Sequence, residues 1–249
     1  MTIVILFVFG LIVGSFLNVL GLRWNSGLSI GGRSFCVSCH KKLNWWELVP
    51  VVSFVGLRGK CSGCQTKISW QYPLIELWMA LLFISITNYL VLIVFCIYVV
   101  ITIYDFRHKI IPDALSYSAL VLAIIFRFLQ TSSSALDWFV GPILFVFFAL
   151  TWLISKGRAM GFGDAKLSLS IGLLLGATNG FSALVLAFVI GSVASLAYMA
   201  MIKLFNPLFK GAKKLTMKSE IPFAPFLILG AWIALIYNLD LLHVLYFTK

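Results

Sequence analysis

The sequence predicts an all-α polytopic membrane protein of about eight transmembrane helices, with one small extramembrane domain between the first and second helix. Of its 249 residues 61% are hydrophobic and only 11% are charged, whereas a soluble domain carries about 25% charged residues. Apolar runs near the length needed to cross a bilayer recur along the chain. The first run lacks a basic leader and a small-residue cleavage site, so we expect a retained helix rather than a signal peptide.

The apolar runs divide the chain into a first transmembrane helix (residues 1–22), an extramembrane domain (23–73) and a helical membrane domain (74–249). The predicted spans are 2–22, 74–87, 88–104, 114–130, 138–155, 167–178, 181–202 and 222–247. The second and third of these are short, so whether residues 74–104 form two helices stays open.

The net charge of +11 reflects membrane topology rather than a nucleic-acid partner, because the basic residues lie in short loops beside the spans. With the N-terminus outside, four segments share one side and hold 17 of the 19 Lys and Arg residues: 23–73, 105–113, 156–166 and 203–221. Such a bias predicts that this side is cytoplasmic and that the protein is a multi-pass plasma (inner) membrane protein. The lysines of 203–221 are expected to contact anionic lipid heads.

Polar groups near the first and second spans have several open interpretations. Gly14 and Asn18 lie on one face of the first helix and suit close helix packing. Arg23 follows at the cytoplasmic exit and fits a topology anchor. Glu76, at the start of the second span, either caps that helix or lines a cavity.

Two cysteine pairs mark the extramembrane domain. Cys36 and Cys39 are separated from Cys61 and Cys64 by a 21-residue gap, and two such pairs predict a four-thiolate zinc site. The site is predicted to be closed and structural, since all four ligand positions are filled. Disulfides are the alternative, which a reducing cytoplasm disfavours.

The other residues of this domain are not expected to bind the metal or to catalyse hydrolysis. We expect His40 to be a bystander rather than a fifth ligand. The apolar residues between the cysteine pairs either form a miniature core or rest at the membrane interface; they are Leu43, Trp45, Trp46, Leu48, Val49, Val51, Val52 and Phe54. The serine-elbow pattern of residues 27–31 lacks the required strand and helix, and no His-Glu-x-x-His pattern is present, so neither route to hydrolysis is expected.

Two aspartates lie at the ends of apolar runs. Asp105 ends the third span, and Asp164 lies where a glycine-flanked loop enters a later span. A carboxylate inside a membrane costs at least about 2.5–3.5 kcal/mol, so such acids tend to be functional. Asp113 follows Pro112 and has a structural explanation as a helix cap, and Asp137 is expected to be solvated in an outer loop.

Asp105 and Asp164 are predicted to lie on the same side of the membrane, which suggests a shared site. Two adjacent carboxylates cannot both ionise cheaply. The charged one can then deprotonate water while the neutral one polarises a carbonyl, which is peptide hydrolysis without a catalytic metal. Gly161 and Gly163 allow a tight turn and a close backbone approach, and Lys166 either offsets the charge of Asp164 or marks the inner face.

These residues resemble the type IV prepilin peptidases, a family of Gly-x-Gly-Asp membrane aspartyl proteases. The resemblance runs through Gly14 to Val19 with Arg23, the cysteine pairs, residues 59–61, and Ile68-Ser69 followed by Tyr72-Pro73 and Glu76. It continues through Asp105 to Asp113 and through Gly161-Phe162-Gly163-Asp164 with Lys166. One departure is Val37, where the family usually has proline.

The resemblance implies that Asp105 and Asp164 are the catalytic pair, with Asp113 outside it. It implies prepilin or pseudopilin substrates, cut on the cytoplasmic side after a glycine that ends a short basic leader. Many members also methylate the new N-terminus with S-adenosylmethionine, and Asn18, Arg23 and Glu76 are candidates for methyl-transfer or substrate contacts. A protease without methyltransferase activity, an ion- or proton-coupled transporter, and a non-enzymatic membrane anchor for a zinc module remain as alternatives.

Overall fold

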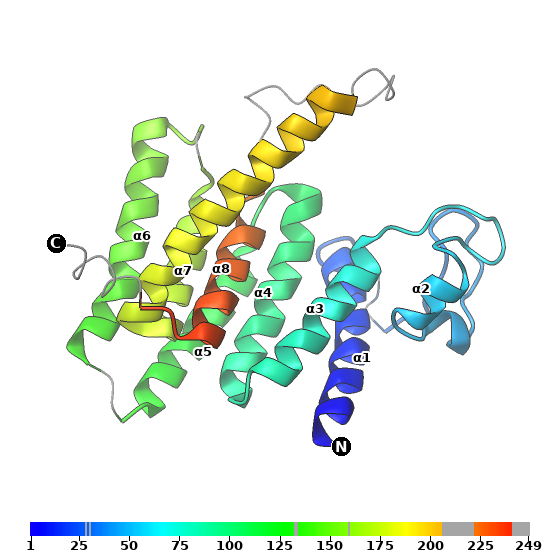
Figure 1. Ribbon diagram of the computed structural model, residues 1–249, viewed down its shortest axis with the longest axis horizontal. Coiled ribbons are helices and arrows are strands. Elements are labelled where there is room, and N and C mark those ends of the chain that lie inside the picture. The colour runs from blue at the N-terminus through cyan, green and yellow to red at the C-terminus, as the bar shows by residue number, and fades with distance from the viewer. Residues whose placement is uncertain (28, 30, 132–133, 159, 206–221, 241–249) are drawn as a thin grey trace. The chain divides into compact units, whose positions relative to one another are not determined.

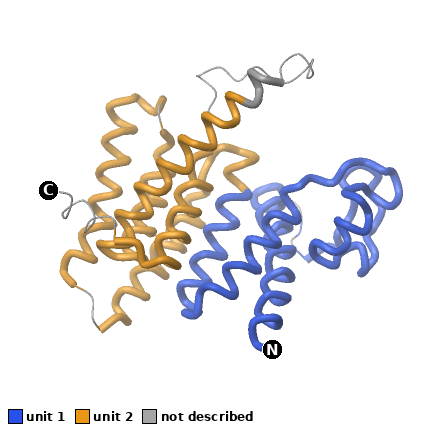
Figure 2. The backbone as a smooth tube through the Cα atoms, in the orientation of Figure 1, with its two compact units in different colours: residues 1–103 blue, residues 104–249 orange. Residues whose placement is uncertain are grey.

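The computed structural model describes the chain except for residues 28, 30, 132–133, 159, 206–221 and 241–249. It is helical, and isolated bridges are the only β-structure among the described residues. The elements are α1 (Thr2–Arg23), η1 (Trp45–Leu48), α2 (Val52–Gly56), α3 (Gln71–Ser85), α4 (Tyr89–His108), α5 (Asp113–Leu129), α6 (Ala135–Ser155), α7 (Phe162–Phe205) and α8 (Ala224–Tyr237) (Figure 1). The chain forms two compact units, residues 1–103 and 104–249 (Figure 2).

In the first unit, α1 packs directly against α3. The contact is close because Gly14 has no side chain: a Cβ there would lie 2.8 Å from the Cα of Glu76. Asn18, one turn further along α1, is buried and donates to the backbone oxygen of Tyr72 on α3 at 3.3 Å. The predicted packing role of the Gly14–Asn18 face is confirmed.

Residues 74–104 form two helices, which settles a question that the apolar pattern left open. Helix α3 ends at Ser85 and α4 begins at Tyr89. Between them, the side-chain oxygen of Asn88 accepts hydrogen bonds from the N–H groups of Leu90 (3.0 Å) and Val91 (3.3 Å). Asn88 therefore starts α4 as an N-cap, a role that asparagine favours.

The second unit is organised around α7, which packs against α5, α6 and α8. The predicted spans 167–178 and 181–202 belong to this one element, which is interrupted at Gly176, where φ is +78°. Arg127 of α5 donates to the backbone oxygens of Leu173 (2.9 Å) and Leu174 (3.3 Å) before the break. Asp137 of α6 accepts from the N–H of Ala177 after it, at 2.8 Å.

Arg127 and Asp137 thus satisfy backbone groups that the break at Gly176 would otherwise leave unpaired. The prediction that Asp137 is solvated was wrong: its carboxylate also lies 3.8 Å from the guanidinium of Arg127. The helix break is therefore a built feature of the second unit.

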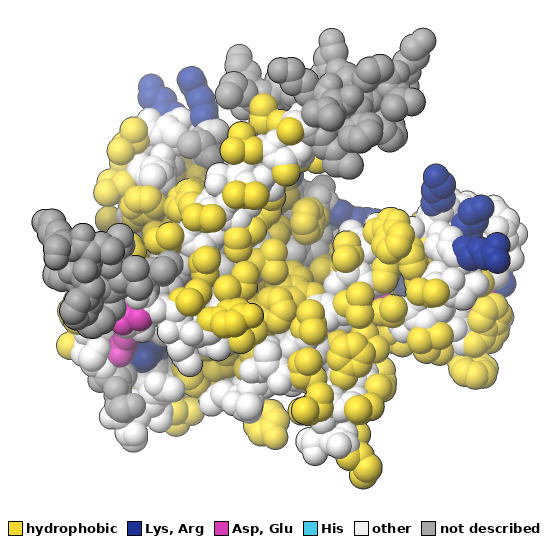
Figure 3. Space-filling model, viewed as in Figure 1, with side chains coloured by type: hydrophobic (Ala, Val, Ile, Leu, Met, Phe, Trp, Pro, Cys, Tyr) yellow, Lys and Arg dark blue, Asp and Glu magenta, His cyan; other side chains and the backbone are white. Residues whose placement is uncertain are grey.

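The surface of both units suits a lipid environment. Four elements are long and apolar enough to cross a membrane: α1, α4, α6 and residues Phe162–Ala200 of α7. Helices α3 and α8 are apolar but shorter. Large hydrophobic side chains are exposed along these helices, and Figure 3 shows them covering much of the visible face. The chain is a polytopic, all-α membrane protein, as predicted.

Helix α8 is shorter than predicted, because it ends at Tyr237, inside the predicted span 222–247. Of the eight apolar residues expected to form a miniature core in the extramembrane domain, only Phe54 is buried, so the miniature-core alternative was wrong for the set. The lysine side chains of 203–221, expected to contact lipid heads, lie outside the described residues.

Candidate functional site: two unpaired aspartates and a four-cysteine cluster

Asp105 and Asp164 lie together in the second unit. Asp105 is in the last turns of α4 and Asp164 is the third residue of α7. Both are buried, with 4% and 7% of their surface exposed, and the charge of Asp105 acts directly on the carboxyl group of Asp164. Among the described residues neither forms an ion pair with Lys or Arg.

Backbone N–H groups hold one side of each carboxylate. The N–H of Gly161 donates to Asp164 Oδ2 at 3.2 Å, and the N–H of Ala224 donates to Asp105. Asp105 Oδ2 is buried and accepts no hydrogen bond from the residues that the structure describes. One carboxylate oxygen of the pair is therefore available to a ligand that can donate, such as water.

Ala224 is a site residue that the sequence analysis missed. It is the first residue of α8, directly after Phe223 and before Pro225. The signal was present, because proline near a helix start marks an N-terminus whose N–H groups are free to donate. Nothing in the sequence, however, indicated that this helix start would meet Asp105.

The two glycines of the Asp164 loop differ in their surroundings. A Cβ on Gly163 would lie 2.8 Å from the Cβ of Ile111, closer than real side chains approach. For a Cβ on Gly161 the nearest described atom would be Asp164 Oδ2, at an ordinary 3.6 Å. The expected close backbone approach therefore holds at Gly163 but not at Gly161.

Lys166 pairs with Asp113 rather than with Asp164. Its Nζ lies 2.6 Å from Asp113 Oδ1 and over the rings of Tyr117 (5.4 Å) and Phe162 (5.3 Å). The prediction of Asp113 as an N-cap was wrong: it is the first helical residue of α5, after the N-cap Pro112, which itself makes no side-chain cap. The ion pair ties the start of α5 to the start of α7.

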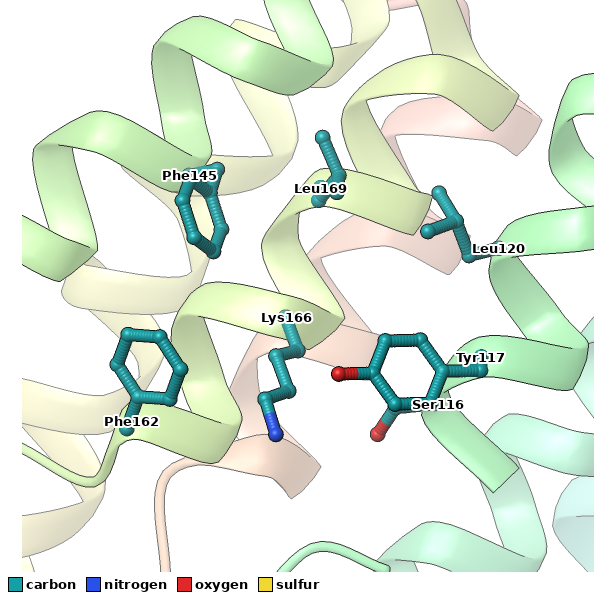
Figure 4. A pocket seen from close by; sticks show the side chains of 7 residues that line it. All are labelled: Ser116, Tyr117, Leu120, Phe145, Phe162, Lys166 and Leu169. Atoms are coloured by element: carbon teal, nitrogen blue, oxygen red, sulfur yellow. The ribbon is translucent and has the colours of Figure 1, made fainter. Parts of the chain in front are cut away.

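A cavity of about 220 Å³ opens beside this ion pair. Figure 4 shows Lys166 between the rings of Phe162 and Tyr117, which come from α7 and α5. The remaining lining residues are Ser116, Leu120, Phe145 and Leu169. The cavity is thus mostly apolar with one cationic group at its edge.

The four cysteines of the first unit form one cluster. Their Sγ atoms all lie within 4.8 Å of one another, and those of Cys36 and Cys64 are 3.8 Å apart. Zinc–sulfur bonds of about 2.3 Å in a tetrahedron place sulfur atoms about 3.8 Å apart. None of the cysteines is in a disulfide, so the cluster could hold a metal ion such as zinc.

Each cysteine pair lies in a small hairpin of the same design. Cys36 and Cys61 each donate and accept backbone hydrogen bonds across a short turn, and His40 and Gln65 occupy the same left-handed position after the second cysteine. His40 stacks on Phe35 at 5.8 Å and is not part of the sulfur cluster. This supports its role as a bystander.

The electrostatics of the cluster favour a bound cation. Side-chain and backbone donors on Thr66 lower the pKa of Cys64 to about 6. The pKa of Cys39 instead rises to about 11: the N–H of Lys41 lowers it, but the neighbouring thiol of Cys64 and burial outweigh that effect. Four sulfurs this close cannot all ionise unless positive charge lies between them.

The remaining candidates lie in the first unit. Arg23 donates to the backbone oxygens of Ser29 (2.7 Å) and Gly32 (3.3 Å), so its charge organises the loop after α1. Glu76 is buried in α3 beyond its first turn, which excludes the cap interpretation. Its carboxylate accepts from the N–H of Val51 at 2.8 Å.

Comparison with known proteins agrees with this arrangement. A model described as the bacterial peptidase A24 N-terminal domain matches residues 8–90, and one described as the type IV leader peptidase family matches residues 90–196. The relatives include proteins named prepilin leader peptidase/N-methyltransferase. The one from Bacillus subtilis is 31% identical and covers 94% of each chain. The one from Pseudomonas aeruginosa is 30% identical over 92% of this chain and 88% of its own.

The relative from Pseudomonas putida is 28% identical over 93% of this chain and 89% of its own. No solved structure matches the chain. The chain is similar to the Bacillus subtilis relative over nearly the whole length of both proteins. It therefore belongs to the type IV leader peptidase family and is a multi-pass enzyme of the inner membrane.

Proposed function

We propose that the chain is an aspartyl endopeptidase that removes the leader of type IV prepilins or pseudopilins, with Asp105 and Asp164 as its catalytic pair. The supporting observation is the pair itself: two buried carboxylates that act on each other and that have, among the described residues, no cation partner and no donor to Asp105 Oδ2. Charges buried without partners are costly, and a structural role does not explain two of them side by side.

In this mechanism the pair holds one proton between two carboxyl groups. The charged member takes a proton from a water molecule, and the protonated member donates to the carbonyl oxygen of the scissile peptide. The Ala224 and Gly161 N–H groups fix the orientation of each carboxyl group, and this leaves the remaining oxygens for water and substrate. The peptide bond is cut by the water without a covalent intermediate.

The substrate is a chain whose scissile bond follows a glycine at the end of a basic leader and precedes an apolar helix. The site lies at the ends of α4 and α7, which suits cleavage beside a membrane-embedded helix. The excess of Lys and Arg in the loops on that side supports a cytoplasmic orientation. A transporter is less well supported, because its acids should lie nearer the middle of the spans.

The named relatives extend the proposal to a second step, N-methylation of the new N-terminal residue with S-adenosylmethionine. Zinc held by the four cysteines would then be structural and would organise residues 23–73. Neither the methyl donor nor zinc is needed for the peptidase step, because the aspartate pair supplies both an acid and a base.

The test replaces Asp105 or Asp164 by asparagine in the full-length enzyme and measures cleavage of a prepilin by mass spectrometry. Each change should lower the cleavage rate by at least about 100-fold, the usual contribution of a general acid or base. Asp113→Asn is the matched control, since that acid is exposed and paired with Lys166, and it should retain most activity. Retained cleavage in the Asp105 or Asp164 variant would refute the proposal.

A further inference from the structure

Six of the eight acids of this protein fall into two groups. Glu47, Asp113 and Asp137 each lie within 4 Å of a Lys or Arg nitrogen: Lys41, Lys166 and Arg127 respectively. Glu76, Asp105 and Asp164 form no such pair among the described residues, although each is more than 90% buried. Two of these three acids are accounted for by the proposed peptidase pair. Glu76 is the third, and it lies in the other unit.

Glu76 lies where α3 packs against α1, and Asn18 lies on the facing side of that contact. Its carboxylate accepts from the N–H of Val51 and from the hydroxyl of Ser15, whereas a carboxylate can accept about four hydrogen bonds. Asn18 follows one turn after Gly14, whose backbone contacts Glu76. Asn18 is 1% exposed, and within the described part of the chain nothing donates a hydrogen bond to its Oδ1.

This excess of acceptors requires an explanation, because buried polar atoms are nearly always satisfied. A negative carboxylate and an unused amide oxygen together match a group that is positively charged and rich in N–H donors. A primary ammonium has three N–H donors and one positive charge, as the head of a lysine side chain does. The new N-terminus released by leader cleavage is such a group.

We propose that Glu76 and Asn18 form the site that binds the N-terminal ammonium of the cleaved pilin and that Glu76 takes its proton for methyl transfer. This rests on the proposed function, which supplies the amine and names the sulfonium methyl donor. The ammonium gives one proton to Glu76, and the freed nitrogen lone pair attacks the donor's methyl carbon. The carbon–sulfur bond breaks, and its electron pair stays on sulfur as a neutral thioether. The product is a methylated ammonium, and Glu76 later returns its proton to water.

A purely structural role for Glu76 makes a different prediction. Val51 has φ of +61°, which is unusual for a β-branched residue, and Glu76 could simply anchor its N–H. That role needs one acceptor oxygen but no negative charge. Glu76→Gln keeps such an oxygen at almost the same volume, so it separates an anchor from a proton acceptor.

The experiment incubates full-length Glu76→Gln enzyme with a prepilin and S-adenosylmethionine, and mass spectrometry reports cleavage and methylation on the same product. Cleavage should stay within about threefold of the wild type, and methylation should fall by about 100-fold, as for loss of a general base. Asn18→Asp, which keeps one acceptor oxygen, should retain part of the methylation.

A binding measurement without any methyl donor gives an independent readout. The probe is a synthetic peptide with the sequence of the mature pilin N-terminus, either with a free ammonium or N-acetylated. The wild type should bind the free form about tenfold more tightly, as expected for a hydrogen bond between charged groups, and Glu76→Gln should lose this difference.

Wild-type methylation or an unchanged binding preference in Glu76→Gln would refute the site. Loss of cleavage together with methylation would also refute it, because the carboxylate would then serve the fold or the peptidase step. A failure of the proposed function is distinguishable, since unaltered enzyme would then leave the prepilin uncleaved or the cleaved product unmethylated.

Discussion

The cysteine cluster and the aspartate pair both gather polar groups, but they draw them from very different separations along the chain. Each cysteine pair lies within one four-residue turn, and the two turns are repeats of one hairpin design. The aspartates come from α4 and α7, and the N–H that orients Asp105 comes from α8. The cluster therefore depends on local turns that could share one metal ion, whereas the pair depends on how whole helices pack.

The largest effect should follow from removing the metal of the cysteine cluster. A segment this small gains only about 3–5 kcal/mol from its own core, whereas zinc binding contributes about 10–16 kcal/mol in comparable peptides. Chelation should therefore unfold residues 33–67. Hydrogen exchange measured by mass spectrometry should show lost protection there.

The same measurement contains its own control. Helices α5 and α7 hold no cysteine ligand, so their protection should not change, and returned zinc should restore residues 33–67. Continued protection of 33–67 in the metal-free protein would contradict the view that the ion holds this segment together.

An intermediate effect is expected at the aspartate pair from a single methyl group. In Gly163→Ala the new Cβ would lie 2.8 Å from that of Ile111, so the start of α7, and Asp164 with it, must move. Overpacking of this kind costs about 1–3 kcal/mol, and a displacement of about 1 Å at a reacting group can cost 100-fold in rate. Cleavage of a prepilin should fall by about 10- to 100-fold.

Gly161→Ala is the matched control, because it adds the same methyl group two residues away, where its nearest neighbour is at an ordinary distance of 3.6 Å. It also keeps the N–H that donates to Asp164. Cleavage should stay within about threefold of the wild type. Equal losses in both variants would show that the loop needs glycine flexibility rather than the close contact with Ile111.

The sequence predicted the local site more completely than the distributed one. Cys-x-x-Cys spacing fixes the turn and hence the direction of both sulfurs, so all four ligands could be named without coordinates. For the aspartates, the cost of acids at the ends of apolar runs led to the prediction that Asp105 and Asp164 share a site, and the two do lie together. The sequence could not predict Ala224, because a backbone N–H has no residue signature and its position depends on the packing of α8.

Side-chain partners were the least predictable feature. Asp113 was expected to cap a helix and Asp137 to be solvated. Instead, Asp113 pairs with Lys166, which is 53 residues away, and Asp137 pairs with Arg127 of the preceding helix. Both pairings depend on α7, whose break at Gly176 brings backbone groups to Asp137 and Arg127. Spacing along one helix carries no information about such contacts.

The smallest effect concerns Glu47, which links the two cysteine hairpins. Its carboxylate accepts from the N–H of Asn44 at 2.7 Å and from Ser62, and it pairs with Lys41 at 3.2 Å. These donors lower the pKa of Glu47, the Asn44 N–H most of all. A carboxyl group with a lowered pKa stabilises the folded state above its ordinary pKa, and this contribution is lost as the pH falls toward the lower value.

Acid also protonates the cysteine ligands, so the measurement must compare two proteins. Thermal unfolding of the zinc-loaded extramembrane segment, followed by hydrogen exchange, should show Glu47→Gln less stable at neutral pH by about 1 kcal/mol, since Lys41 is partly exposed. The difference from the wild type should shrink as the pH falls through the range where Glu47 becomes protonated, because ligand protonation is common to both proteins. A difference that stayed constant down to acidic pH would mean that the shape of Glu47, and not its charge, joins the two hairpins.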